Sequence, residues 1–232
     1  MYFDAHINAT IQAPTFAPHI GGGLLFGVQT IAHEQLSAGK WHVAAVQNKW
    51  GPCQNSAPLI DLQLGPGELL SHLKRPLAEW LVLLEPIRLK RQFLRLNPPS
   101  GASTVVGIRK LAQHYRHVRF IIDPFQHGPD GGWQAQARLA ECDNIWLTTL
   151  GLAPGPARRW NRAEEVHEAF HFAMGEVGAS KLLFASGHDW SSAEYFFSDP
   201  QKWLAEIKVL DEDQRALILR ENARELFGFA CE

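Results

Sequence analysis

Residues 1–8 read Met-Tyr-Phe-Asp-Ala-His-Ile-Asn, and residues 181–190 read Lys-Leu-Leu-Phe-Ala-Ser-Gly-His-Asp-Trp. Each stretch is a short apolar run that ends in polar residues able to take part in catalysis. In a parallel barrel, such side chains gather where the strands end, at the carboxyl end of the sheet. We therefore predict that these stretches are the first and last strands of one sheet. The polar residues they would bring together are Asp4, His6, Asn8, Ser186, His188 and Asp189.

The rest of the chain alternates between short apolar runs and stretches with helical spacing. Strands are predicted at residues 2–7, 42–47, 59–64, 80–89, 120–123, 145–149 and 182–185. Helices are predicted at 24–38, 67–79, 104–117 and 133–142, and after Asn161 and Asp211, which begin capping-box patterns with Glu164 and Gln214.

This alternation predicts an α/β fold, a compact TIM-type (β/α) barrel that forms a single domain over residues 1–232. A complete eight-unit barrel typically needs about 250 residues, and this chain has 232. Seven strand candidates therefore allow the loss of one βα unit. We place that loss in the loop at residues 48–58, which is rich in Gly, Pro, Asn and Ser.

The composition indicates which binding partners and which cellular compartment to expect. The formal net charge is −2 and no basic stripe occurs, which argues against nucleic acid as a partner. No run of 18 apolar residues occurs, so no membrane span is predicted. The three cysteines lie far apart and form no Cys-x-x-Cys pair, which favours a reducing, cytoplasmic compartment. We expect a small-molecule substrate, and the sequence allows a homodimer.

Five motifs in order resemble the amidohydrolase-related branch of the amidohydrolase superfamily. That branch contains zinc decarboxylases and metal-free lactonases on a distorted TIM barrel. Its usual first strand, Asp-x-His-x-His, is similar to residues 4–8, and its acid-His turn after a buried strand is similar to 115–124. Residues 144–151 resemble its Asn-Val-Tyr-x-x-x-Ser-Gly strand. The stretches at 181–190 and 222–228 resemble its last strand and its closing Asn-Ala-x-x-Leu-Phe-Gly helix.

The sequence differs from this pattern at two positions where the family has metal-binding histidines. Asn8 replaces the second His of the first motif, and Pro124 replaces the His that usually follows the acid. Zinc needs three or four N, S or O donors. Because two of the usual ligands are replaced, we assign no metal or other cofactor from the resemblance. If zinc is bound, the candidate ligands are His6, Asp189, His127 and His188.

The resemblance implies a hydrolase that acts on a small anionic lactone, ester or amide. Asp189 would be the general base for the attacking water, and His6 would polarise the carbonyl directly or through a weakly held metal. Asn8 could donate a hydrogen bond to the oxyanion, and Arg88 could hold a substrate carboxylate. Further substrate-binding candidates are Glu85, at the end of a predicted strand, Asp123, His188 and Trp190.

Simpler interpretations stand beside these roles. Asp123 before Pro124 is also a common turn pattern, Glu85 can simply pair with Arg88, and His127 fits a solvated loop. The alternative for the whole molecule is a non-catalytic barrel with a degraded metal site that binds a small ligand or a protein partner.

Overall fold

The computed structural model describes residues 2–8, 20–26, 41–43, 45–47, 59–64, 66–98, 101–153, 158–189 and 200–227. Side chains are described within residues 59–64, 67–98, 101–153, 158–187 and 200–227.

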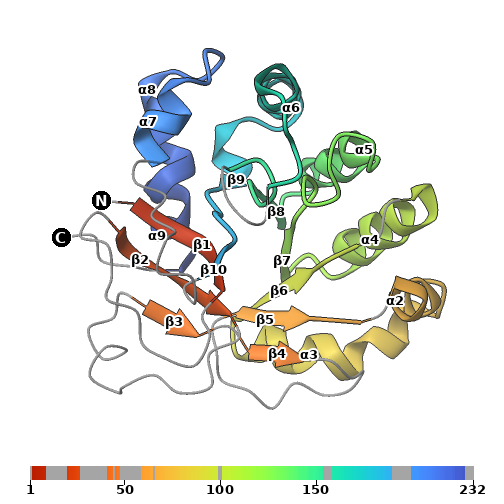
Figure 1. The fold of residues 1–232 in the computed structure, drawn as a ribbon. Coiled ribbons are helices and arrows are strands. Elements are labelled where there is room, and N and C mark those ends of the chain that lie inside the picture. The colour runs from red at the N-terminus through yellow and green to blue at the C-terminus, as the bar shows by residue number, and fades with distance from the viewer. Residues whose placement is uncertain are drawn as a thin grey trace.

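Strands and helices alternate along the described chain, as expected for an α/β protein (Figure 1). The strands are β1 (Tyr2–Asn8), β2 (Ile20–Phe26), β3 (Trp41–Val43), β4 (Ala45–Gln47), β5 (Leu59–Leu62), β6 (Phe93–Leu96), β7 (Arg119–Ile122), β8 (Ile145–Thr148), β9 (Leu182–Leu183) and β10 (His188–Asp189). The α-helices are α2 (Pro66–Leu73), α3 (Leu81–Leu89), α4 (Ala102–His114), α5 (Trp133–Ala137), α6 (Ala163–Glu176), α7 (Pro200–Ala205), α8 (Glu212–Ala216) and α9 (Asn222–Phe227). Short 3₁₀ segments are η1 (Leu77–Trp80), η2 (Arg138–Glu141) and η3 (Ala179–Lys181), and η4 (Leu217–Glu221) is a π-helical turn.

The strands form a closed parallel ring. One sheet has the order β10-β1-β2-β3 and the other the order β4-β5-β6-β7-β8-β9, and every pairing between neighbours is parallel. Only one residue separates β3 from β4, and four residues separate β9 from β10, so each pair is one interrupted strand that passes from one sheet to the other. The ring therefore has eight strand positions, and the fold is the predicted TIM-type barrel.

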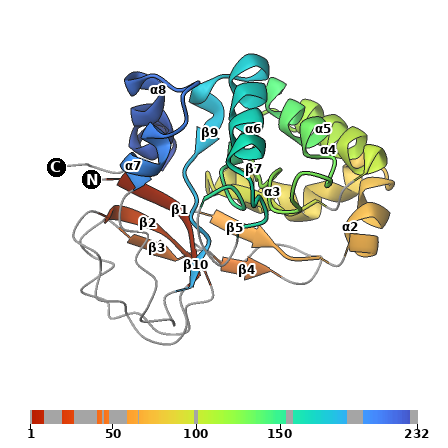
Figure 2. The same cartoon turned by 45° about the horizontal axis from the view of Figure 1, so that its top comes forward.

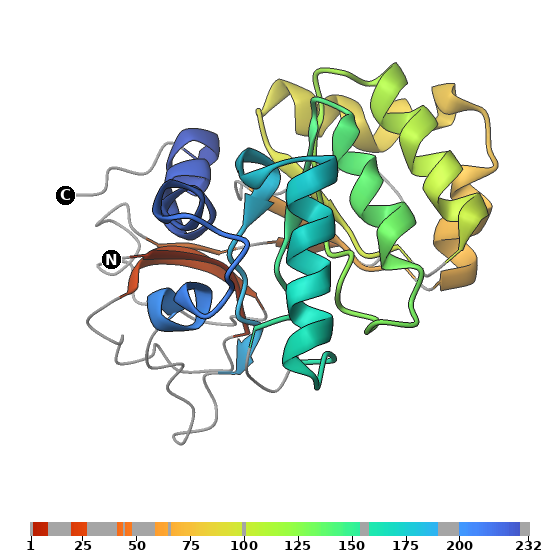
Figure 3. The ribbon, with the colours of Figure 1, turned by 90° about the horizontal axis from the view of Figure 1, so that it is seen from above.

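Side-chain alternation divides the described strands into an outer and an inner face. Outward residues such as Ile60, Leu94 and Phe120 pack in one cluster with the helices, and helices α2 to α6 lie in a row along one side of the molecule (Figure 3). Inward residues such as Leu59 and Phe93 form a second cluster with α9. The Phe227 ring lies 4.6 Å from the Phe93 ring, and because Phe93 begins β6, α9 covers the amino end of the ring.

The strand count from sequence is wrong because two strands lie where we expected other structure. Strand β2 contains Gly21-Gly22-Gly23, and glycine is a weak strand former. Residues 24–26 belong to this strand rather than to a helix; residues 27–38 lie outside the described part. Strand β6 was not predicted because we assigned the strand in this region to residues 80–89 instead.

Residues 81–89 form helix α3 rather than an extended stretch. Leu83, Leu84 and Ile87 are buried on one side, which is helical spacing. Pro86 lies inside this helix, although proline lacks the N–H that an inner helical residue donates. Its carbonyl still accepts a hydrogen bond from the N–H of Lys90 at 3.1 Å.

Candidate functional site

The end of β1 and the end of the last strand lie side by side, as predicted. The register pairs Ile7 with His188 and Asn8 with Asp189, and His6 lies two residues before Asn8 in β1. Both strands run toward the carboxyl end of the ring (Figure 2). The side chains of these residues, and all of Trp190, lie outside the described part, so their catalytic and binding roles stay predictions.

A buried ion network lies inside the ring on β5 and β6 and directly after β7, strands that are not neighbours of β1 and β10 in the strand order. Asp61 of β5, Arg95 of β6 and Asp123 after β7 are 1%, 4% and 0% exposed. Asp61 and Arg95 are partners in the β5–β6 register, and each lies two residues beyond an inward apolar residue, Leu59 and Phe93. The alternation of the strands therefore directs both side chains into the ring.

Asp123 is the main partner of Arg95. The Nε atom of Arg95 donates to Oδ2 of Asp123 at 2.7 Å, and Nη2 donates to the same oxygen. The Thr148 hydroxyl of β8 donates to Oδ1 of Asp123. Both oxygens are thus bound by protein groups. Direct substrate contact by Asp123 stays a prediction.

Asp61 is the weaker partner of Arg95. Its Oδ2 accepts a hydrogen bond from Nε2 of Gln63 at 2.7 Å and from Nη1 of Arg95 at 3.4 Å. Burial raises the pKa of Asp61 above its ordinary value, although Arg95 and Gln63 oppose this and lower it. Burial alone would lower the pKa of Arg95, but Asp123 and Asp61 raise it above its ordinary value. Arg95 is therefore a permanent cation between two carboxyl groups.

The loops beyond β6, β7 and β8 are held against one another. The indole N–H of Trp160 donates to the carbonyl of Phe125 at 2.7 Å. Gly151 has a φ of 96°, and a Cβ there would lie 2.6 Å from the same carbonyl oxygen. Only glycine fits this close approach, so the loop after β8 is packed directly on the loop after β7.

Glu85 and Arg88 lie on helix α3, so the predicted place of Glu85 at the end of a strand is wrong. The binding roles of both residues stay predictions. They pair with each other on the surface, where Nε and Nη2 of Arg88 donate to the Glu85 carboxylate at 2.8 and 2.5 Å. The hydrogen bond from Arg88 lowers the pKa of Glu85. Because α3 leads into the amino end of β6, the pair lies toward the end of the ring opposite the predicted site.

The described side chains do not fit a zinc ion. Among them, no three His, Cys, Asp or Glu residues come close enough together to hold a metal. The Nε2 atom of His127 lies 3.2 Å from the carbonyl oxygen of Pro98, and Asp123 is occupied as described above. The role of His127 as a metal ligand stays a prediction.

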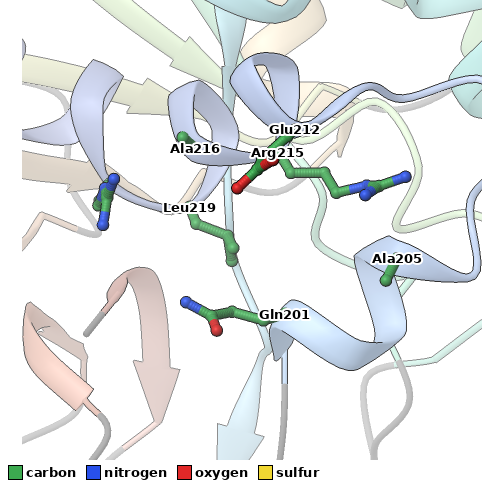
Figure 4. A pocket seen from close by; sticks show the side chains of 7 residues that line it. Gln201, Ala205, Glu212, Arg215, Ala216 and Leu219 are labelled. Atoms are coloured by element: carbon green, nitrogen blue, oxygen red, sulfur yellow. The ribbon is translucent and has the colours of Figure 1, made fainter.

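A pocket of about 310 Å³ lies elsewhere, between α7 and the segment formed by α8 and η4 (Figure 4). Gln201 and Ala205 of α7 face Ala216 and Leu219 across it. Its walls are helix side chains rather than strand ends, so we place the candidate site in the ring and not here.

Asp61, Arg95 and Thr148 were not among the residues selected from sequence. A signal was present: an acid and an arginine interrupt the apolar strands Leu-Ile-Asp-Leu and Phe-Leu-Arg-Leu. A charged residue inside a buried strand requires a partner. Sequence could not identify that partner, because Asp61 and Asp123 lie 34 and 28 positions from Arg95.

The sequence profile of the family described as Amidohydrolase matches residues 60–229. The chain belongs to the amidohydrolase family. No curated protein matches it.

Within the described part of the chain, no helix has the length and the apolar surface that a membrane span needs.

Solved structures of amidohydrolases share this fold at low identity. One is an Acinetobacter baumannii protein named as a probable 2-pyrone-4,6-dicarboxylic acid hydrolase, with citric acid bound (TM-score 0.67, 18% identity, 98% of this chain and 99% of that chain covered). Another is amidohydrolase 2 from Bifidobacterium longum subsp. infantis (0.60, 14%, 99% and 99%). A third is a Burkholderia multivorans amidohydrolase with bound zinc (0.59, 12%, 91% and 84%).

Proposed function

We propose that this amidohydrolase hydrolyses a small anionic lactone, ester or amide at the carboxyl end of the ring. The observation that carries this proposal is the register of β1 and β10, in which Asn8 is opposite Asp189. A carboxylate can serve as the general base for water attack on a carbonyl, and a neighbouring amide can donate a hydrogen bond to the oxyanion.

In this mechanism Asp189 takes a proton from water as the water oxygen bonds to the carbonyl carbon. A carboxylate that is partly removed from solvent is a competent general base near neutral pH. His6 polarises the carbonyl, and Asn8 donates a hydrogen bond to the oxyanion that forms. The C–O or C–N bond then breaks, and the leaving group takes up the proton.

The anionic substrate class is supported by the names of related structures. A 2-pyrone-4,6-dicarboxylic acid is a lactone with two carboxyl groups, and the A. baumannii structure holds citric acid. Both molecules are small, rich in oxygen and anionic at neutral pH. We therefore propose lactones that carry carboxylate groups as the first compounds to test.

Asp189→Asn should reduce turnover by about 10²–10⁴-fold, the usual contribution of a general base, because an amide cannot accept the proton of water. The measurement is a hydrolysis screen over carboxylated lactones, esters and amides. Asp130→Asn, a change on an exposed loop, is the matched control and should retain wild-type rates. Equal rates in wild type and Asp189→Asn would remove Asp189 from the mechanism.

The second candidate is a barrel that binds a ligand without turnover. It is favoured by Asn8 and Pro124, which replace two histidines of the family pattern. Compounds that bind to the wild type but are never hydrolysed would support it. Elemental analysis of protein purified without chelator would show whether the protein holds zinc.

A further inference from the structure

A groove of about 720 Å³ lies on the outer surface of the barrel, between α4 and the segment that joins α2 to η1. Its first wall is the segment from Leu73 to Leu77, and its second wall is the part of α4 from Ala102 to Lys110. Helices α2 and α4 lie side by side outside the sheet (Figure 1). The groove contains no strand end, so it is separate from the candidate site in the ring.

The wall that α4 supplies is one face of this helix. Residues three and four positions apart lie on the same side of a helix, and the lining residues of α4 are Ala102, Ser103, Val106, Gly107 and Lys110. The two walls approach each other most closely at Gly107, where a Cβ atom would lie 2.9 Å from the Cβ atom of Leu73. Glycine therefore allows α4 to pack directly on the end of α2 along the groove.

Positive charge gathers in this groove. Three of its ten lining residues are the cations Lys74, Arg75 and Lys110, and none is an acid. Lys74 and Lys110 are exposed, and neither forms an ion pair with a described residue. Arg75 pairs with Glu79 at 3.4 Å on the surface, where such a pair is weak. Although the chain has a net charge of −2, the groove therefore attracts anions.

Apolar side chains lie between these cations. Val106 is 52% exposed, and Leu73 and Leu77 are half-buried. Val106 precedes Lys110 by one helical turn, so the two side chains lie on the same side of α4. A ligand with an anionic group near the lysines would therefore lay an attached carbon chain against Val106 and the two leucines.

We propose that this groove binds a phosphate monoester of a small apolar alcohol. The phosphate group lies between Lys74 and Lys110, and the alkyl or aryl group packs on Leu73, Leu77 and Val106. A phosphate monoester carries a charge of about −1.5 to −2 at neutral pH, which matches two ammonium groups better than a single carboxylate does. Lysine binds phosphate as a point charge on a flexible stem. The inference does not depend on the proposed hydrolysis.

The size of the groove favours a small molecule over a segment of a partner protein. Its volume of about 720 Å³ is within the usual range of small-molecule sites, about 300–1,000 Å³. The part of α4 that lines it covers residues 102–110, a length of about 12 Å at 1.5 Å per residue. An acidic peptide is therefore treated as an outcome of the test.

Three probes separate the contributions of charge and of apolar contact: hexyl phosphate, inorganic phosphate and 1-hexanol, each titrated into the full chain by calorimetry. Hexyl phosphate should bind about tenfold or more tightly than inorganic phosphate, since burial of two methylene groups accounts for such a factor. It should exceed 1-hexanol by at least as much. Equal affinities for hexyl phosphate and inorganic phosphate, or no binding of hexyl phosphate, would overturn the proposal.

Substitutions on the two walls test the same division. Lys74→Gln and Lys110→Gln should each weaken hexyl phosphate and inorganic phosphate alike, by about three- to fivefold. Val106→Thr keeps the shape of the side chain and should weaken hexyl phosphate alone, by about two- to fourfold. The matched control is Lys208→Gln, at an exposed lysine between α7 and α8, which should leave all affinities unchanged. Unchanged hexyl phosphate affinity in a variant with both Lys74→Gln and Lys110→Gln would contradict the inference.

Amide NMR of the wild type locates the ligand without any variant. Hexyl phosphate should shift the signals of Lys74, Ser103 and Val106, and shifts confined to the strand ends of the ring would place the ligand in the candidate site and refute the inference. A hexaglutamate peptide that shifts the groove signals and binds more tightly than hexyl phosphate would also refute it, because the groove would then be a docking surface for protein.

Discussion

Arg95 joins three neighbouring strand ends inside the ring. Its guanidinium on β6 contacts Asp61 on the neighbouring strand β5 and Asp123 directly after the neighbouring strand β7. Removing one partner from a buried ion pair leaves an uncompensated charge in a region of low dielectric, which is far more costly than losing a surface pair. Losing any single charged member of this network should therefore destabilise the fold.

Arg95→Met keeps most of the side-chain volume and removes the charge. Because Asp123 and Asp61 lose their cation, the free energy of unfolding should fall by about 3–5 kcal/mol. Urea unfolding at neutral pH, followed by circular dichroism, measures this change. The matched control is Arg88→Met, which breaks the exposed pair with Glu85 and should leave stability nearly unchanged. A similar small effect for both variants would contradict the buried network.

Asp61 should make stability depend on pH in a defined direction. Its pKa in the folded protein is raised above the ordinary value of 3.8, so above that pH the folded state holds a proton that the unfolded chain releases. The folded state then binds more protons, and this contribution to stability is lost as pH rises. The free energy of unfolding of Asp61→Asn should therefore increase relative to wild type as pH rises above about 4. A difference that stays constant with pH would be the contrary result.

At the level of elements, two helix starts had the same sequence pattern and only one forms the cap. Asp211 accepts a hydrogen bond from the N–H of Gln214 at 2.8 Å, and Oε1 of Gln214 accepts one from the N–H of Asp211 at 3.0 Å. Helix α6 instead begins after Arg162, with no side-chain cap. The predicted capping box of Asn161 is therefore wrong.

Asp211→Ala should lower the free energy of unfolding by about 1 kcal/mol, the usual effect of losing an N-cap side chain. The matched control is Asn161→Ala, which removes an exposed side chain that caps nothing and should have little effect. Thermal and urea unfolding of the two variants in the same buffer give the comparison. Equal losses would mean that the cap of α8 does not stabilise the protein.

At the level of the whole molecule, the carboxyl-terminal helices hold the last strand position of the ring. The carbonyl of Ile218, in the π-helical turn η4, accepts a hydrogen bond from the N–H of Phe184. The amide nitrogen of Asn222 donates to the carbonyl oxygens of Ala179 and Leu182 at 2.7 Å each. These contacts position the strand that carries Asp189.

Asn222→Ala should destabilise the protein by about 1–3 kcal/mol, because two buried carbonyl groups lose their donor. Glu225→Ala, an exposed change on the same helix, is the control for helix propensity. Hydrogen exchange of β9 amides should accelerate in Asn222→Ala and not in the control. Unchanged exchange would show that α9 does not hold this strand.

The sequence determined the barrel class, because alternating apolar strands and amphipathic helices leave a parallel sheet as the simplest way to bury both. It also determined that residues 1–8 and 181–190 are neighbours, since their polar ends follow the pattern of first and last barrel strands. The cap at Asp211 was local and therefore readable. The strand β2, with its run of glycines, and the helix α3, which we predicted as a strand, were not readable in this way.

Only the tertiary structure decided which charged residues meet. Asp61, Arg95 and Thr148 lie on three strands and Asp123 directly follows a fourth. The local sequence around each residue does not indicate which of the others it contacts. Strand register brings them to the same part of the ring, and burial makes their pairing energetically necessary. Local sequence can indicate that a buried charge needs a partner, but long-range strand pairing chooses that partner.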